Sequence, residues 1–305
     1  QLTDGAGLGT TALWASVTGA GKPADNADVS PALPSDEHLV GYWAFDEGNG
    51  TVAVDGSGRG NNGTLVNGPT WVDGVVGKCL DFTRVNTEYV SIPSNADLQI
   101  TGDLTVAGWF NFDEIPVPAH TGLVSKAYGG EWLWQIYKPS TMYVWHDSVI
   151  RASWGITGSI VAGNWYHLAI VRDGTAKTYK IYCNGELKTT SAPYATAPPT
   201  SYTHVTIGSS GSHVQPFNGL IDEVRIYNRA LTASEIKALY LYPAGNKGVA
   251  DTMKLTGIEA GATKNVIYRQ AAAPTGANGD LWYDTDDPLK PLYRHNGTTW
   301  EEIGN

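Results

Sequence analysis

Apolar and polar residues alternate in short runs through the middle of the chain, and glycine, asparagine and proline separate these runs. From Leu220 to Tyr227 the apolar positions fall mostly on every second residue and include β-branched side chains. This pattern predicts a half-buried antiparallel strand. The pair Asn184-Gly185 between two such runs predicts a hairpin, because both residue types tolerate positive φ. The pattern therefore indicates short strands joined by turns from 38 to 242.

A short helix is predicted immediately after the strand that ends at Tyr227. Thr232 and Glu235 have the spacing of a capping box, in which each side chain bonds a free backbone N–H of the first turn. Ile236, Leu239 and Tyr240 would share one side of this helix.

The character of the sequence changes on both sides of this central region. Residues 1–37 show little periodicity and are interpreted as a linker or attachment segment. After residue 242 a strand-like run at 264–269 is followed by a glycine- and proline-rich break, and 279–303 has the pattern of a small hairpin unit. We therefore expect three segments, 1–37, 38–242 and 243–305, of which the last is a small β appendage.

Composition narrows the function classes. Thirty-six glycines and 16 prolines among 305 residues, with 16% charged residues, suit a turn-rich β protein. The formal net charge of −10 argues against nonspecific binding to nucleic acid or to an anionic membrane, because phosphate binding needs clustered Lys and Arg. No apolar run reaches 18 residues, so membrane insertion is not expected.

The two cysteines, Cys79 and Cys183, each lie in an apolar strand pattern. A free thiol in such a place behaves as a small hydrophobic side chain. We favour buried thiols over a disulfide.

The ordered motifs of the central region resemble the laminin-G-like members of the concanavalin A-like superfamily. The segment that carries the resemblance most clearly is 217–236, with Gly219-Leu-Ile-Asp-Glu-Val-Arg-Ile-Tyr227 at its centre. The other motifs, in chain order, are 38–46, 55–65, 77–82, 104–110, 165–174 and 181–187. The resemblance implies a two-sheet antiparallel jelly-roll sandwich that binds glycans or protein partners, with the strand at 219–227 paired beside the first strand.

The flanking segments resemble parts of phage tail proteins. The run from Trp14 to Ala27 is similar to junctions between modules of tail and host-specificity proteins, and 279–303 is similar to repeats of tail fibres. This resemblance implies a virion protein that acts outside the cell, is attached to other virion tail proteins and forms a homo-oligomer, with a trimer favoured.

A calcium site is the sharpest chemical hypothesis, because Ca²⁺ needs several carboxylate and carbonyl oxygens held by a turn. Asp55 and the turn up to Asn61 could supply such oxygens, and the family resemblance implies that Asp222 faces them from the returning strand. Asp46, at the end of the first strand, is a further candidate. The alternative is that Asp55 and Asn61 only bond their own turn.

Aromatic residues concentrate between 131 and 154, where a sugar could stack its C–H face on a ring. The candidate ligand-binding residues are Trp132, Trp134, Tyr143, Trp145, His146 and Trp154. The alternative is that most of these side chains fill the core of the sandwich.

Catalysis finds little support in the sequence. The Glu-x-Asp-x-x-Glu motif of glycanases with this fold does not occur, and no pair among Glu88, Asp103, Asp113 and Glu114 is set apart as an acid and a nucleophile. The histidines lack the spacing of a zinc site.

The sequence thus predicts a non-enzymatic binding module of a phage tail fibre or receptor-binding protein, with bacterial surface polysaccharide as its partner. One alternative is a carbohydrate-binding or adhesion module of a protein that is secreted or held at the cell surface. Others are a glycan hydrolase or lyase and a structural spacer.

Overall fold

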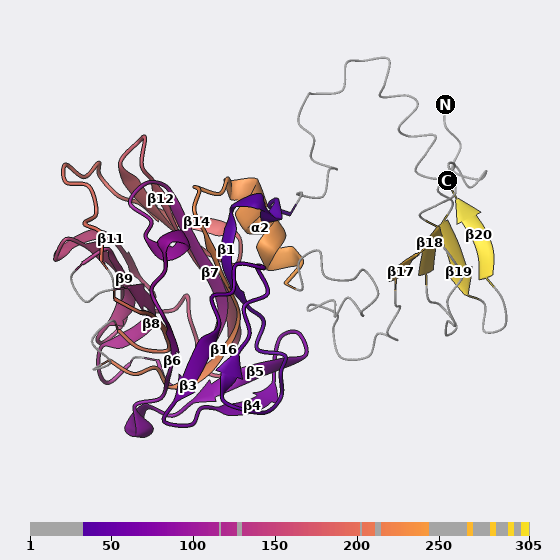
Figure 1. Ribbon diagram of the computed structural model, residues 1–305. Helices are drawn as coiled ribbons and strands as arrows, with labels where there is room; N and C mark the ends of the chain where they lie inside the picture. The colour runs from indigo at the N-terminus through magenta and orange to yellow at the C-terminus, as the bar shows by residue number, and fades with distance from the viewer. Residues whose placement is uncertain are drawn as a thin grey trace, which may run out of the picture.

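The described residues up to 243 fold as a β-sandwich of two antiparallel sheets with one short helix, as the computed structural model in Figure 1 shows. The structure describes residues 33–115, 117–126, 130–201, 203–210 and 215–243, together with the backbone of four strands between 267 and 304. The predicted all-β jelly-roll class is confirmed. The N-terminal segment 1–32, with its phage-like motif, lies outside the described residues.

The first sheet, sheet A, has the order β14-β13-β12-β7-β16-β5-β4, and β1 also pairs with β16. Its strands are β1 (Leu39–Trp43), β4 (Thr70–Asp73), β5 (Lys78–Phe82), β7 (Leu104–Phe112), β12 (Trp165–Asp173), β13 (Thr178–Cys183), β14 (Glu186–Thr190) and β16 (Gly219–Tyr227). The turn between β13 and β14 is the predicted Asn184-Gly185 pair, and both residues have positive φ.

The second sheet, sheet B, has the order β11-β10-β9-β8-β15-β6-β3-β2. Its strands are β2 (Val52–Ala53), β3 (Gly63–Val66), β6 (Tyr89–Ile92), β8 (Thr121–Lys126), β9 (Trp132–Tyr137), β10 (Thr141–His146), β11 (Val149–Gly155) and β15 (Val205–Ile207). The described residues include three single turns of 3-10 helix: η3 (Asp36–His38) before β1, η4 (Arg84–Asn86) between β5 and β6, and η5 (Ala96–Leu98) between β6 and β7.

Strand β16 lies in the middle of sheet A. Its first half lies between β7 and β5, and its second half lies between β7 and β1, with Leu39 opposite Tyr227. The predicted pairing of the returning strand with the first strand is therefore confirmed. A bulge separates the two halves, and Glu223 within it has φ 54°. Asp222 and Glu223 are both buried, like every other residue of β16 except the half-buried Leu220.

The core between the sheets is rich in aromatic side chains. Phe110 on β7 and Trp134 on β9 meet edge to face at 5.4 Å, and both are fully buried. Cys79 and Cys183 are buried free thiols, as expected. Burial raises the pKa of the Cys79 thiol to about 12, so this thiol is neutral and unreactive at physiological pH.

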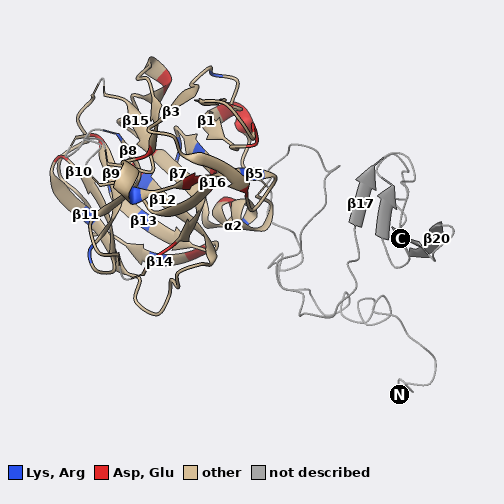
Figure 2. Cartoon of the chain, turned by 90° about the horizontal axis from the view of Figure 1, so that it is seen from below, with Lys and Arg blue, Asp and Glu red and all other residues tan. Residues whose placement is uncertain are grey.

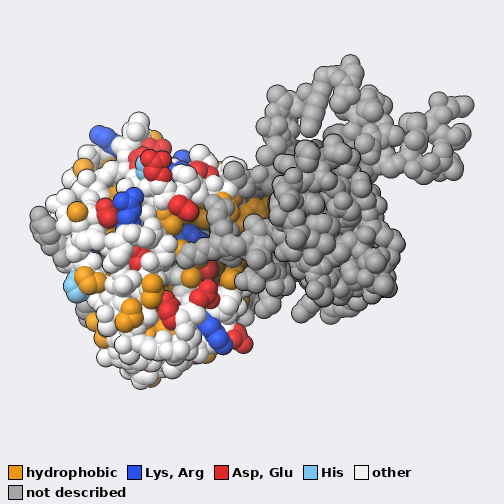
Figure 3. Space-filling model, turned by 45° about the vertical axis from the view of Figure 1, so that its right-hand side comes forward, with side chains coloured by type: hydrophobic (Ala, Val, Ile, Leu, Met, Phe, Trp, Pro, Cys, Tyr) orange, Lys and Arg blue, Asp and Glu red, His pale blue; other side chains and the backbone are white. Residues whose placement is uncertain are grey.

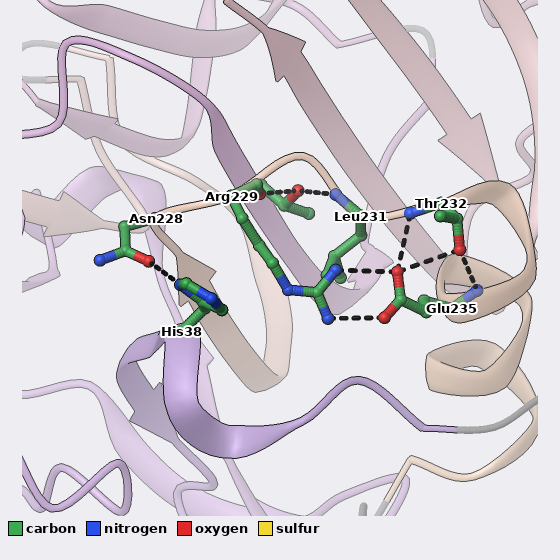
Figure 4. Close-up of polar contacts among 7 residues, drawn as sticks. His38, Asn228, Arg229, Leu231, Thr232 and Glu235 are labelled. Carbon is green, nitrogen blue, oxygen red and sulfur yellow. Dashed lines mark hydrogen bonds and ion pairs between the residues drawn. The ribbon is translucent and has the colours of Figure 1, made fainter.

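Helix α2 (Ala233–Leu241) covers the outer face of sheet A and begins with the predicted capping box. The Thr232 hydroxyl accepts a bond from Glu235 N–H, and the Glu235 carboxylate accepts one from Thr232 N–H (Figure 4). Arg229 adds a two-armed ion pair to Glu235, which lowers the pKa of that carboxyl to about 2. Ile236 and Leu239 are buried against the sheet, and Tyr240 stacks on Trp109 at 5.7 Å.

The appended β segment is a four-stranded sheet of its own. Its strands are β17 (Ile267–Gln270), β18 (Leu281–Asp284), β19 (Leu292–His295) and β20 (Trp300–Gly304). Strands β18, β19 and β20 pair antiparallel, as the predicted hairpin unit requires, and β17 adds a parallel strand beside β18.

Candidate functional site

Two neighbouring strands of sheet B present aromatic rings on the outer surface of the sandwich. On β10, Met142 and Val144 point into the core, so Tyr143 and Trp145 point outward by the alternation of a strand. Tyr137 ends β9 on the same outer side and is 40% exposed. The outer face of sheet B therefore carries a group of partly exposed rings.

These rings form a continuous row, which we call the outer aromatic row: His120, Tyr137, Tyr143 and Trp145. His120 stacks on Tyr137 with ring centres 3.8 Å apart. Tyr137 meets Tyr143 edge to face at 5.4 Å, and Tyr143 meets Trp145 edge to face at 6.3 Å. Burial and the charge of Lys138 lower the pKa of His120, so its imidazole is neutral at physiological pH. The row is an uncharged aromatic surface.

Polar groups without partners lie beside the row. Gln135 belongs to β9. It lies opposite Tyr143 of β10 on one side and opposite Gly122 of β8 on the other. Gly122 N–H donates to the carbonyl of Gln215 at 2.8 Å, so the two glutamines flank the same glycine. Among the described residues, neither glutamine Oε1 nor the indole Nε1 of Trp145 has a hydrogen-bond partner. All three atoms are buried, so a ligand on the rings would reach them only after neighbouring side chains move.

Gly122 is required because a loop approaches the outer face of β8 at this point. A Cβ at residue 122 would lie 2.3 Å from backbone atoms of both Ser209 and Ser210. This distance is shorter than any contact that a side chain tolerates, so only glycine lets the loop cover β8. The loop leaves the rings of β9 and β10 partly exposed.

Of the six predicted ligand-binding residues, the structure places two on the outer face of sheet B and the other four in or against the core. Tyr143 and Trp145 are partly exposed and belong to the outer aromatic row. Trp132 and Trp134 are at most 1% exposed and lie in the core, and Trp154 packs against the core from the edge of the sheet. For these three side chains the core alternative holds, because they occupy the inward positions of their strands.

His146, the sixth candidate, is fully buried. One ring nitrogen lies 2.9 Å from the Tyr179 hydroxyl and the other 3.0 Å from the Thr196 carbonyl. Burial, helped by Arg151 and Arg172, lowers its pKa to about 4. His146 is thus a neutral internal histidine whose polar atoms are satisfied.

Sequence reasoning missed His120, Tyr137, Gln135 and Gln215. The signal for Tyr137 was available, since it follows Trp132 and Trp134 in the same aromatic stretch. Its odd position places it on the opposite side of β9 from both tryptophans. His120 and Gln215 lie outside regular strands, and only the fold brings them to this face.

Of the predicted calcium ligands, Asp55 is held by its own turn. Its Oδ1 accepts from Tyr42 N–H at 3.0 Å and from Ser57 N–H at 2.9 Å. Its Oδ2 accepts from the Ser57 hydroxyl at 2.8 Å and from Asn61 N–H at 2.9 Å. The Asn61 amide donates to the Val40 carbonyl at 2.7 Å. These contacts match the local turn-bonding that the sequence left open as an alternative.

Asp222 and Asp46 instead meet at the turn between β4 and β5. Asp222 Oδ2 accepts from Val75 N–H at 2.8 Å and Val76 N–H at 3.3 Å. Asp46 Oδ1 accepts from Lys78 N–H at 2.9 Å. Both carboxylates therefore support one turn, and neither bonds the turn that holds Asp55.

The second oxygen of Asp222 is buried and has no hydrogen-bond partner in the described part of the chain. Burial raises the pKa of Asp222 well above its usual range, and the nearby charges of Glu223 and Asp46 act in the same direction. A buried carboxylate in this setting either holds a proton or pairs with a cation. Across the described residues, no group of three or more His, Cys, Asp and Glu side chains is arranged around one metal position.

The four carboxylates considered for catalysis have structural partners. Glu88 accepts from Thr83 N–H at 2.6 Å and from the Asn86 amide at 2.8 Å. Glu114 pairs with Arg84, Asp113 accepts from Asn218, and Asp103 accepts from Gly174 N–H. These contacts are consistent with roles in turns and strand ends.

Lys and Arg positions are spread over several strands and loops in Figure 2, and hydrophobic side chains lie mostly among polar ones on the face drawn in Figure 3. Within the described ranges no helix has the length and apolar character needed to cross a bilayer.

Comparison with known proteins identifies the superfamily to which this fold belongs. The family model described as the concanavalin A-like lectin/glucanases superfamily matches residues 84–237, slightly more than half of the chain. No curated protein sequence matches significantly.

Solved structures share the fold at low sequence identity. The binding domain of paraclostridial mosquitocidal protein 1 is 16% identical with a TM-score of 0.56, over 68% of this chain and 53% of that one. Domain 4 of the extracellular arabinanase AbnA from Geobacillus stearothermophilus, in complex with arabinotriose, is 20% identical with a TM-score of 0.51, over 66% of this chain and 98% of that one. The binding domain of botulinum neurotoxin DC, in complex with SialylT, is 12% identical with a TM-score of 0.54, over 67% of this chain and 51% of that one. The chain thus spans about half the length of the two toxin domains.

Proposed function

Because the chain belongs to the concanavalin A-like lectin/glucanases superfamily, we propose that it is a non-catalytic module that binds glycans on the outer aromatic row. The observation that carries the proposal is the continuous contact of four rings on the outer face of sheet B, three of them at 5.4 to 6.3 Å from centre to centre. Rings that fill the core would point inward, whereas these point outward and stay partly exposed.

The chemistry of the row suits a sugar. The C–H face of a pyranose is apolar and packs on Tyr and Trp rings, while its hydroxyls need hydrogen-bond partners. Among the described residues, Gln135 Oε1, Gln215 Oε1 and the Trp145 indole N–H are buried groups of these kinds without a partner, and a ligand would reach them after neighbouring side chains move. That an arabinanase domain of the same fold is seen with arabinotriose supports this class of ligand.

The biological setting in this proposal is a phage tail fibre or receptor-binding protein that attaches to bacterial surface polysaccharide. The support is the resemblance of the two flanking segments to phage tail proteins. In this setting the chain is part of the virion, contacts other tail proteins and forms a homotrimer. The mass of the full chain in solution at micromolar concentration tests the oligomer, and a monomer would contradict it.

Calcium is the proposed structural ion, held by Asp222 and Asp46 at the turn between β4 and β5. The support is the buried, unpartnered Oδ1 of Asp222 and its raised pKa, since a divalent cation would neutralise both carboxylates. Asp55 and Asn61, whose side chains are occupied by their own turn and by Val40, would not be ligands.

A bacterial surface-glycan array tests the proposed function, with the full chain applied in calcium and in chelator and the same wells assayed for released fragments. We expect retention without cleavage, and loss of retention in Tyr143→Ala and Trp145→Ala. Trp71→Ala is the matched control, because Trp71 is a partly buried tryptophan on β4 of the other sheet. Released reducing ends would instead indicate a hydrolase or lyase. Binding that survives both row variants would refute the assignment of the row.

A further inference from the structure

A hollow opens at one end of the sandwich, among loops that contribute nothing to the outer aromatic row. Its volume is about 420 Å³, within the range of small-molecule sites. Three connections line it: the segment before β7 (101–103), the turn between β12 and β13 (174–177) and the segment after β14 (194–198). We call it the loop-end pocket.

Of the polar side chains that line this pocket, Asp103 has a hydrogen bond within the protein. Asp103 Oδ1 accepts from Gly174 N–H at 2.7 Å, and its second oxygen is free of donors. Within the described ranges, the Lys177 ammonium and the hydroxyls of Thr101, Thr175 and Tyr194 have no hydrogen-bond partner. The residues that line the pocket therefore include one carboxylate, one lysine and three hydroxyl-bearing side chains.

The back of the pocket is rigid. The Tyr194 ring is 7% exposed, and His146 packs edge to face against it at 4.6 Å. Tyr194 N–H donates to the Lys177 carbonyl at 2.8 Å, which ties the two sides of the pocket together. The fully buried Arg172 donates to the Gly102 carbonyl at 2.6 Å and so fixes a third side. Little ordering would be needed on binding.

Gly174 keeps the pocket open beside Asp103. A Cβ at residue 174 would lie 3.1 Å from Asp103 Oδ1 and 3.3 Å from the Gly102 carbonyl carbon, so a larger side chain would push the carboxylate away. The glycine both donates to the carboxylate and leaves space in front of it.

From this arrangement we infer that the loop-end pocket is a second binding site, which takes a single sugar residue. A carboxylate accepts from two adjacent hydroxyls, an ammonium and threonine hydroxyls bond the remaining oxygens, and the tyrosine supplies a flat wall. The inference rests on the proposed glycan-binding function and adds to it. Two sites on one module would raise the avidity for a polymer that reaches both.

The test is a titration of the isotope-labelled full chain, followed by backbone amide NMR. The probes are methyl glycosides of neutral hexoses, 6-deoxyhexoses and hexuronic acids at millimolar concentration. We expect at least one of them to shift the amides of Gly102, Gly174 and Thr175 saturably. Asp103→Asn should weaken that binding about 10-fold, because a hydrogen bond to a charged acceptor is lost.

Thr175→Trp is a second variant, which fills the pocket from an exposed position and so leaves the core intact. Its matched control is Ser159→Trp, at an exposed turn between β11 and β12 at the other end of the sandwich. We expect Thr175→Trp to abolish the pocket shifts, and both Ser159→Trp and Trp145→Ala to retain them.

Each outcome decides between the two sites. Shifts confined to the amides around Tyr143 and Trp145, or no shift with any probe while the glycan array binds, would overturn the pocket and leave the proposed function standing. Pocket shifts that persist in Thr175→Trp would also overturn it. Pocket shifts with a silent array and unaffected row amides would support the pocket and contradict the outer aromatic row.

Discussion

His167 on β12 should make the protein sensitive to mild acid. The imidazole is 1% exposed, lies 5.5 Å from Trp109 and 6.4 Å from Tyr240, and has no hydrogen-bond partner for either ring nitrogen among the described residues. Burial, with a smaller contribution from the charge of Arg225, lowers its pKa from 6.5 to about 3. The folded protein therefore keeps His167 neutral at pH values where the unfolded chain binds a proton.

The sign and size of the effect follow from proton linkage. A group whose pKa is lower in the folded state costs stability as the pH falls below the unfolded value, over the window from about 6.5 to about 3. At pH 5 protonation of this one residue raises the statistical weight of the unfolded state by a factor of about 30, while the weight of the folded state hardly changes. That factor corresponds to about 2 kcal/mol of lost unfolding free energy relative to pH 7.

The perturbation is His167→Phe, which keeps a ring between Trp109 and Tyr240 but cannot bind a proton. Urea unfolding of the full chain, followed by tryptophan fluorescence, gives the unfolding free energy at pH 7 and pH 5. We expect the natural protein to lose about 2 kcal/mol more than the variant between these pH values. His204→Gln, which removes an exposed histidine, is the control and should keep the natural slope. Equal losses in the natural protein and His167→Phe would refute the reasoning.

Three further perturbations probe other features. Gly122→Ala should lower the unfolding free energy by about 1 to 3 kcal/mol, because its Cβ would clash with a loop backbone at 2.3 Å, whereas Gly155→Ala on β11 meets nothing within 4 Å and should change it little. Thr232→Ala removes the cap of α2 and should cost about 1 kcal/mol in the same assay; an unchanged value would mean that the cap is dispensable. Calcium should raise the melting temperature of the natural protein and of Asp55→Asn but not of Asp222→Asn, and a rise in all three would place any calcium elsewhere.

The strand at 219–227 and the hairpin at Asn184-Gly185 were predictable from local alternation and turn residues, whereas the pairing with the first strand was implied by the family resemblance. The run from Leu220 to Tyr227 is β16, and the capping box at Thr232 starts α2 where expected. The bulge at Glu223 was not predictable from a period of two. It arises where β16 exchanges one neighbouring strand for another, a requirement of the whole sheet rather than of the local sequence.

The candidate site was predictable only in part. Alternation separates Trp132 and Trp134 from Tyr137, but it does not say which side of β9 faces the second sheet. That assignment follows from the packing of Phe110 against Trp134 across the core. In the same way, an aspartate before a glycine-rich turn is compatible with either a cation or backbone donors, and the structure gives Asp55 three backbone N–H donors and the Ser57 hydroxyl.

The central position of β16 has a consequence for how the chain folds. Residue 39 pairs with residue 227. Strands β1, β5 and β7 therefore each lack β16 as a pairing partner until nearly the whole sandwich has left the ribosome. Closing such a long loop is slow, since its entropic cost comes before the contacts that repay it. During synthesis the nascent chain would expose unpaired strand edges, which are prone to aggregation. We expect truncation before residue 219 to yield insoluble material rather than a smaller sandwich.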